Sequence, residues 1–231
     1  MSGPRALGLA TALTALAVWA TPAAAHHVGA WTPRDNEISA NFKQLKFSIQ
    51  AGKFDAAGHL FEAGAVRAEM RARSSRLPAG LEAATREAIQ AGDARGTERW
   101  LMVFFAALAR DLARDADQRL ADPRESPEAR VAAGRKFLDA IWRYYNLVDF
   151  AVTPYDSKAG VTIRLAFDEA EGYAKDPAGT AVTAPASPSS GGERRAVAAP
   201  DPAKMREPLR RLAQTLSGLI EASSTSIRRG T

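Results

Sequence analysis

The chain has 231 residues, of which 46% are hydrophobic and 25% are charged, so it has room for one sizeable core and a few appendages. It contains no cysteine and three histidines, which excludes disulfides, thiolate metal sites, covalently attached haem and thiol nucleophiles. The formal net charge of +5 is too small to identify an anionic partner.

The first 25 residues are typical of a secretory signal peptide. Arg5 precedes the apolar stretch Ala6–Ala20, and an Ala-x-Ala sequence follows it at residues 23–25. The apolar stretch is shorter than the roughly 20 residues that a membrane-spanning helix needs. We therefore expect cleavage after Ala25 and a periplasmic protein with a flexible N-terminus over residues 26–34.

Apolar residues recur at intervals of three and four along the chain after this point, which predicts amphipathic helices. The predicted helices cover 35–51, 54–73 and 80–90, a long one opened by Asp93 or Thr97, one from Ser126 to Pro154, and 157–175. No period-2 pattern of any length predicts a strand. We expect residues 35–175 to form an all-α antiparallel bundle of four main helices with a short extra helix.

Residues 176–203 differ in composition, because they are rich in proline, serine and glycine and almost lack large apolar residues. This composition predicts a disordered linker. Beyond it the apolar positions Met205, Leu209, Leu212, Leu216 and Leu219 predict a tethered amphipathic helix over 204–231.

This C-terminal segment carries six basic and two acidic residues, which accounts for the basic character of the exported chain. Three interpretations are open. The helix packs back on the bundle, docks into a partner protein of the cell envelope, or lies on an anionic membrane surface. Nucleic acid is not expected as the partner of an exported chain.

The histidines supply the candidate metal ligands. Cleavage after Ala25 leaves His26 and His27 at the chain start, where the terminal amine and an imidazole can chelate copper. His59 and Glu62 lie at positions i and i+3 of a predicted helix and could hold copper or iron with acids of a facing helix. The candidate acids are Asp168 with Glu171, and then Asp111 with Asp115. The alternative is an exposed terminus at residues 26–27 and a structural role for His59.

Two short stretches resemble known periplasmic families. Residues 58–62 (GHLFE) are similar to the Gly-x-His-x-x-Glu motif of imelysin-like iron-uptake proteins, with one residue missing between Gly58 and His59. Residues 41–46 (NFKQLK) and 51–57 (AGKFDAA) resemble the first helical hairpin of cytochrome c′-like bundles. That family attaches haem through Cys-x-x-Cys-His, and this chain has no cysteine. The resemblance thus implies the fold and the compartment without haem chemistry.

Aromatic residues gather in two predicted helices, with Trp100, Phe104 and Phe105 in one and Trp142, Tyr144, Tyr145 and Phe150 in the other. They predict either a core of large residues or a pocket between helices for a flat or apolar ligand. No nucleophile–base arrangement, phosphate loop or dinucleotide turn is present in the sequence. We expect an exported, non-enzymatic binding or accessory protein with copper or iron as its small ligand. The alternative is an envelope interaction module acting through residues 204–231.

Overall fold

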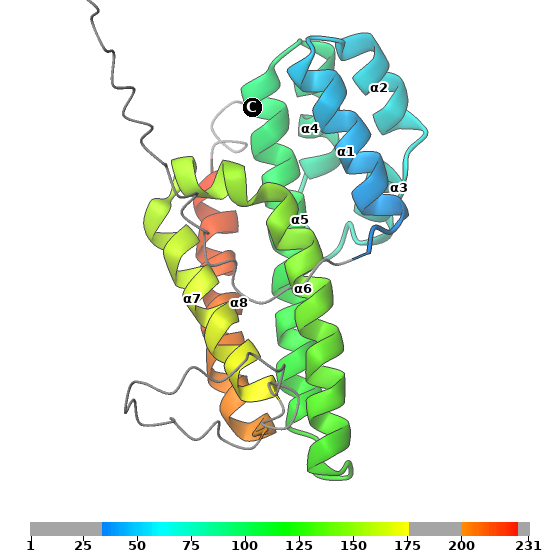
Figure 1. The fold of residues 1–231 in the computed structure, drawn as a ribbon. Helices are drawn as coiled ribbons and strands as arrows, with labels where there is room; N and C mark the ends of the chain where they lie inside the picture. The colour runs from blue at the N-terminus through cyan, green and yellow to red at the C-terminus, as the bar shows by residue number, and fades with distance from the viewer. Residues whose placement is uncertain (1–33, 176–199, 226–231) are drawn as a thin grey trace, which may run out of the picture. The chain divides into compact units, whose positions relative to one another are not determined.

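The computed structural model describes residues 34–175 and 200–225, and these ranges are all-helical without a strand, as predicted (Figure 1). None of the described helices is long and apolar enough to cross a membrane. The predicted signal peptide, His26, His27 and most of the predicted linker lie outside the described residues. The helices are α1 (Glu37–Gln50), α2 (Phe54–Glu62), α3 (Ala65–Ala72), α4 (Leu81–Gln90), α5 (Ala94–Leu120), α6 (Pro127–Tyr155), α7 (Ser157–Ala174) and α8 (Pro202–Ser224).

Side chains at the helix starts fix where the long helices begin. Asn36 caps α1, because its side chain accepts a hydrogen bond from the Ser39 N–H and the Ser39 hydroxyl accepts one from the Asn36 N–H. The predicted cap, Asp35, lies one residue earlier and pairs instead with Lys43. Asp93 caps α5 through the Gly96 N–H, which decides between the two predicted starts of that helix.

The single helix predicted over residues 54–73 is wrong, because the chain breaks at Gly64 into α2 and α3. The side chain of Asn41 reaches into this break. Its amide nitrogen donates to the Leu60 carbonyl (3.1 Å), and its oxygen accepts from the Val66 N–H (3.0 Å). A Cβ atom at position 64 would lie 2.3 Å from that oxygen. Glycine therefore leaves the room that Asn41 needs to satisfy the backbone groups of the break.

The four long helices α5, α6, α7 and α8 pack against one another in a ring, because α5 and α7 each contact both α6 and α8. Helices α1 to α4 pack mainly among themselves, and α4 also packs on α5. The grouping differs from the prediction, because the long helices in mutual contact include α8 and not α1. The C-terminal helix is part of the packed core and not an appendage.

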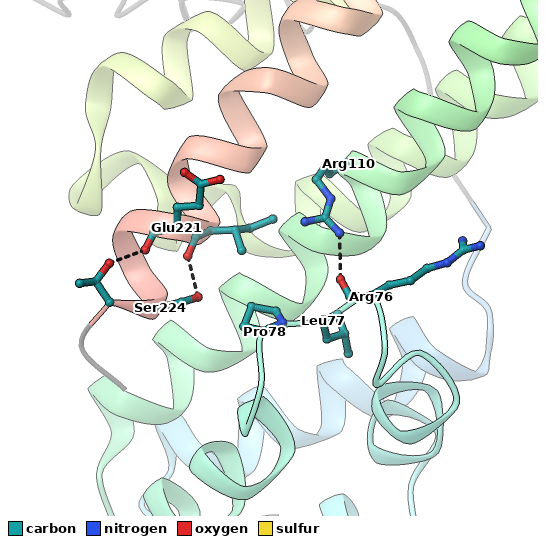
Figure 2. A pocket seen from close by; sticks show the side chains of 8 residues that line it. Arg76, Leu77, Pro78, Arg110, Glu221 and Ser224 are labelled. Atoms are coloured by element: carbon teal, nitrogen blue, oxygen red, sulfur yellow. Dashed lines mark hydrogen bonds between the residues drawn. The ribbon is translucent and has the colours of Figure 1, made fainter. Parts of the chain in front are cut away.

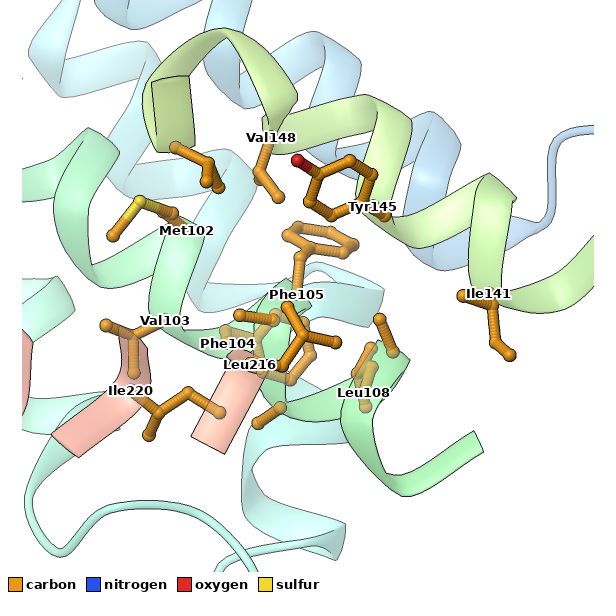
Figure 3. Packing of buried hydrophobic residues seen from close by; sticks show 14 of the residues in the cluster. Met102, Val103, Phe104, Phe105, Leu108, Ile141, Tyr145, Val148, Leu216 and Ile220 are labelled. Carbon is orange, nitrogen blue, oxygen red and sulfur yellow. The ribbon is translucent and has the colours of Figure 1, made fainter. Parts of the chain in front are cut away.

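Helix α8 buries the apolar stripe that the sequence shows. Met205, Leu209, Leu212 and Leu216 are completely buried, and Leu216 belongs to the same cluster as Phe104 of α5 (Figure 3). The helix starts at Pro202, two residues before the predicted start. This packing favours the first of the three interpretations of the segment, in which it folds back on the chain.

The basic residues of α8 face acids of the helix bodies. Arg206 and Arg210 both bind the carboxylate of Asp117 on α5, at 2.6 and 3.0 Å. Arg211 pairs with Glu169 of α7. Three of the six basic residues counted in the C-terminal segment are therefore paired with two acids across the α8 interface. Arg228 and Arg229 lie outside the described residues.

The aromatic residues confirm the prediction of a large-residue core in most positions. Phe104, Phe105 and Tyr145 are almost fully buried, and the rings of Phe42 and Phe105 meet edge to face with centroids 4.7 Å apart. Figure 3 shows Tyr145 beside Phe105 in this cluster. Phe150 differs, because 39% of its surface is exposed.

Candidate functional site

The structure places His59 and Glu62 on α2, but their surroundings differ. His59 is exposed at the edge of a shallow groove between α1 and the α2–α3 junction. The carboxylate of Glu62 binds Arg67 (2.6 Å) and Arg86 (2.7 Å). Both arginines also bind Glu82, so Glu62 belongs to a four-residue ion-pair network that joins α2, α3 and α4.

The expected companion acids lie elsewhere. Helix α2 packs mainly on α1, α3 and α4, whereas α7, which carries Asp168 and Glu171, packs on α6 and α8. Burial and the nearby charge of Glu171 raise the pKa of Asp168. Asp111 is bound by Arg110. Among the described residues, no group of three or more His, Asp or Glu side chains could hold a metal ion. Copper or iron handling stays a prediction that depends on His26 and His27.

A groove of about 450 Å³ lies beside the C-terminal end of α8 (Figure 2). Arg110 lines this groove, and its guanidinium group donates to the Arg76 carbonyl (3.1 Å) and to the Asp111 carboxylate (2.7 Å). The Ser224 hydroxyl donates to the backbone of its own helix, at the Ile220 carbonyl. These polar groups hold the α3–α4 loop and the helix end in place, which is a structural role.

A second cleft, here called the aromatic cleft, has a volume of about 490 Å³ and lies between the start of α5 and the end of α6. It is lined by Arg95, Glu98, Arg99 and Met102 of α5 and by Phe150, Ala151, Pro154 and Tyr155 of α6. The α5 residues are spaced three, one and three apart, so they share one face of that helix.

The end of α6 is set by Asp156, whose extended backbone (φ −148°, ψ 93°) stops the helix and whose side chain caps α7. Pro154 lies inside the last turn of α6, where it has no N–H to donate to the carbonyl of Phe150. Helix α6 ends at Tyr155, one residue later, so that Phe150 and Tyr155 stand on its last turns. The sequence thus leaves two aromatic rings at a helix end, opposite the first two turns of α5.

The α6 side of the aromatic cleft and Met102 of α5 are apolar. Met102 is buried beneath it, and Phe150 and Tyr155 are 39% and 47% exposed. Among the described residues only five large hydrophobic side chains are classed as exposed: Phe47, Phe150, Tyr155, Val161 and Leu165. Two of the three aromatic ones therefore line this one cleft.

Two cationic residues line the cleft, and a third lies over one of its rings. The ammonium group of Lys46 on α1 lies 3.5 Å from the ring centroid of Phe150. The guanidinium of Arg99 lies 5.1 Å from the ring centroid of Trp100. Arg95 is exposed and has no ion-pair or hydrogen-bond partner among the described residues. Glu98 is the one carboxylate among the residues that line the cleft.

Comparison of the chain with protein-family models, with curated proteins and with solved structures finds no match. The resemblances noted in the sequence remain resemblances of short stretches. The aromatic cleft must be interpreted from its own residues.

Sequence reasoning identified Phe150 as part of an aromatic group but missed Arg95, Arg99 and Tyr155. A signal for them exists in the sequence. Helices α5 and α6 are consecutive and joined by a short turn, so the start of α5 is expected beside the end of α6. The cation pair at one end and the aromatic pair at the other could have been placed together on that basis.

Proposed function

We propose that this protein is an exported, non-enzymatic binding protein that holds a small, flat, apolar ligand in the aromatic cleft. The long helices act as an antiparallel bundle that fixes the two walls of the cleft. The observation that carries the proposal is the pair of exposed rings, Phe150 and Tyr155, above the buried floor of Met102.

The dimensions and chemistry of the cleft support binding of a small molecule. Ligand sites typically enclose about 300–1,000 Å³ and are lined by apolar and aromatic side chains with a few polar groups. The aromatic cleft has this size and this mixture. Stacking of a ligand ring on one of its aromatic side chains is worth about 0.5–1.5 kcal/mol beyond the burial of apolar area.

Binding accounts for these residues better than catalysis does. Glu98 is the one carboxylate that lines the cleft, whereas general acid–base chemistry usually pairs two groups with separated pKa values. The interaction-module hypothesis has less support, because the apolar face of α8 is packed on α5 and α7. Export to the periplasm rests on the sequence of residues 1–25.

A fluorescence titration of the purified exported protein with phenylnaphthylamine, a neutral aromatic dye, tests the proposal. We expect saturable binding to one site. Phe150→Ala and Tyr155→Ala should each weaken it about fivefold, because each removes one ring contact worth about 1 kcal/mol. Leu165→Ala is the matched control, since Leu165 is 61% exposed on α7 and does not line the cleft. Equal dye affinity in all four proteins would refute the proposal.

A further inference from the structure

Building on the proposed function, we infer that the ligand of the aromatic cleft is an amphipathic monoanion: a flat apolar body that carries one carboxylate or sulfonate-like group. The body lies against the rings of Phe150 and Tyr155, and the anionic group lies at the side of the cleft formed by Arg95 and Arg99.

The balance of charge around the cleft favours an anion. Arg95 and Arg99 line it, and Lys46 borders it through its contact with the Phe150 ring. Among the residues that line the cleft, one acid, Glu98, stands against the two arginines. The site therefore has a net positive charge, although the residues expected in the mature chain before the C-terminal segment are balanced in acids and bases overall.

Arg95 has the properties of a ligand-binding arginine. Most arginines in the described part of the chain are bound to acids or carbonyl groups, as Arg110 and Arg164 are. The guanidinium of Arg95 is exposed at the cleft and has no such partner among the described residues. A guanidinium offers a planar pair of N–H donors that matches a carboxylate or a similar oxyanion.

Glu98 limits the charge of the ligand. It lies one helical turn from Arg95 and next to Arg99, on the same face of α5. A second negative charge on the ligand would approach this carboxylate and be repelled. A single anionic group can instead bind Arg95 and leave Glu98 in water.

An anionic ligand of this kind can be a free molecule or the headgroup of a lipid in a membrane. We favour the free molecule, because Phe150 and Tyr155 line one cleft together with Arg95 and Arg99, so that a small molecule can contact the rings and the cations at once. A bilayer surface also carries many like charges, which Glu98 would oppose.

Two dyes that differ only in one sulfonate group separate the inference from the proposed function. Phenylnaphthylamine is neutral, and anilinonaphthalene sulfonate is the same molecule with one negative charge. We expect the exported protein to bind the sulfonate more tightly than the neutral dye, with a ratio of affinities that falls as salt is added.

Substitutions in the cleft should change this ratio in opposite directions. Arg95→Gln should lower the ratio of sulfonate to neutral-dye affinity about two- to fivefold, and the double variant Arg95→Gln/Arg99→Gln should lower it about tenfold. Glu98→Gln should raise this ratio about two- to fivefold. Arg71→Gln is the matched control, because Arg71 is exposed on α3 and does not line the cleft. Circular dichroism confirms that each variant is folded.

The outcomes are distinct. Saturable binding of the neutral dye with a ratio that none of the cleft variants changes would overturn the inference and leave the proposed function in place. Failure of the neutral dye to bind would overturn the proposed function itself.

A parallel sedimentation assay uses vesicles of phosphatidylglycerol and phosphatidylcholine. Vesicle binding that depends on Arg95 would assign the cleft to a membrane surface and overturn the inference of a free ligand.

Discussion

The carboxylate of Asp117 on α5 accepts a hydrogen bond from Arg206 of α8 at 2.6 Å. Arg210, one turn further along α8, binds the other oxygen at 3.0 Å. Burial acts to raise the pKa of Asp117, but the hydrogen bonds from the two arginines outweigh burial and hold the pKa below its usual value. This carboxylate therefore ties α8 to α5.

Asp117→Asn should lower the free energy of unfolding by about 1–2 kcal/mol at neutral pH, because two guanidinium groups lose their anionic partner. The pKa of Asp117 is lower in the folded than in the unfolded chain, so its contribution is complete above about pH 4 and is lost as the pH falls through the folded pKa.

Urea unfolding of the variant and the parent between pH 7 and acid pH measures this difference. We expect the gap to narrow only below about pH 4. Asp115→Asn is the control, because Asp115 is exposed on the same helix without a partner among the described residues. A difference in unfolding free energy between the parent and Asp117→Asn that stays constant into acid would contradict the role of the Asp117 carboxylate in stabilising the protein.

The packing of α8 predicts that this helix is needed for folding. Leu216 is completely buried, so Leu216→Ala should cost about 2–5 kcal/mol of stability. Leu165→Ala, at an exposed position of α7, should change stability by less than about 0.5 kcal/mol.

Removal of residues 204–231 should unfold the rest of the chain, which circular dichroism would detect. A truncated chain that melts like the parent would show that α8 is dispensable.

The break between α2 and α3 makes an opposite prediction for two glycines. Gly64→Ala should destabilise the protein by about 1–3 kcal/mol, because its Cβ would collide with the Leu60 carbonyl and the Asn41 side chain. Gly172→Ala on α7 should stabilise it by about 0.5–1 kcal/mol, since nothing lies within 4 Å of that position. Thermal unfolding of both variants provides the comparison. Equal changes in melting temperature would contradict the role of Asn41 in bonding the backbone on both sides of the break.

The placement of Glu62 bears on the metal hypothesis. Its carboxylate is bound by Arg67 and Arg86, so we expect copper titrated calorimetrically into His59→Ala to give the same heats as the parent protein. Glu62→Gln should lower stability by less than about 1 kcal/mol, because this carboxylate is 44% exposed. A stoichiometric copper site lost in His59→Ala, but retained when His26 and His27 are replaced, would restore a metal centre on α2.

The helical class and most helix boundaries could be predicted, because apolar periodicity and capping residues such as Ser126 act locally. The break at Gly64 could not be predicted, because the three–four spacing of apolar residues continues through it. The side chain that bonds the backbone at the break, Asn41, is far away in sequence. The role of α8 was similarly open. An amphipathic stripe shows that a face is buried, but it does not show which surface covers it.

The aromatic cleft shows the same limit. Aromatic side chains in one helix indicated a core or a ligand pocket, and both interpretations apply to different residues, with Tyr145 buried and Phe150 exposed. The cations opposite Phe150 come from another helix, so only the pairing of α5 with α6 brings them together.

Nuclear magnetic resonance of the isotopically labelled exported protein, titrated with anilinonaphthalene sulfonate, tests the central claim most directly. We expect saturable shifts of backbone amide signals concentrated in residues 95–102 and 150–155. Shifts centred instead on the groove around Arg76, Arg110 and Ile220 (Figure 2), or spread evenly over the chain, would contradict it.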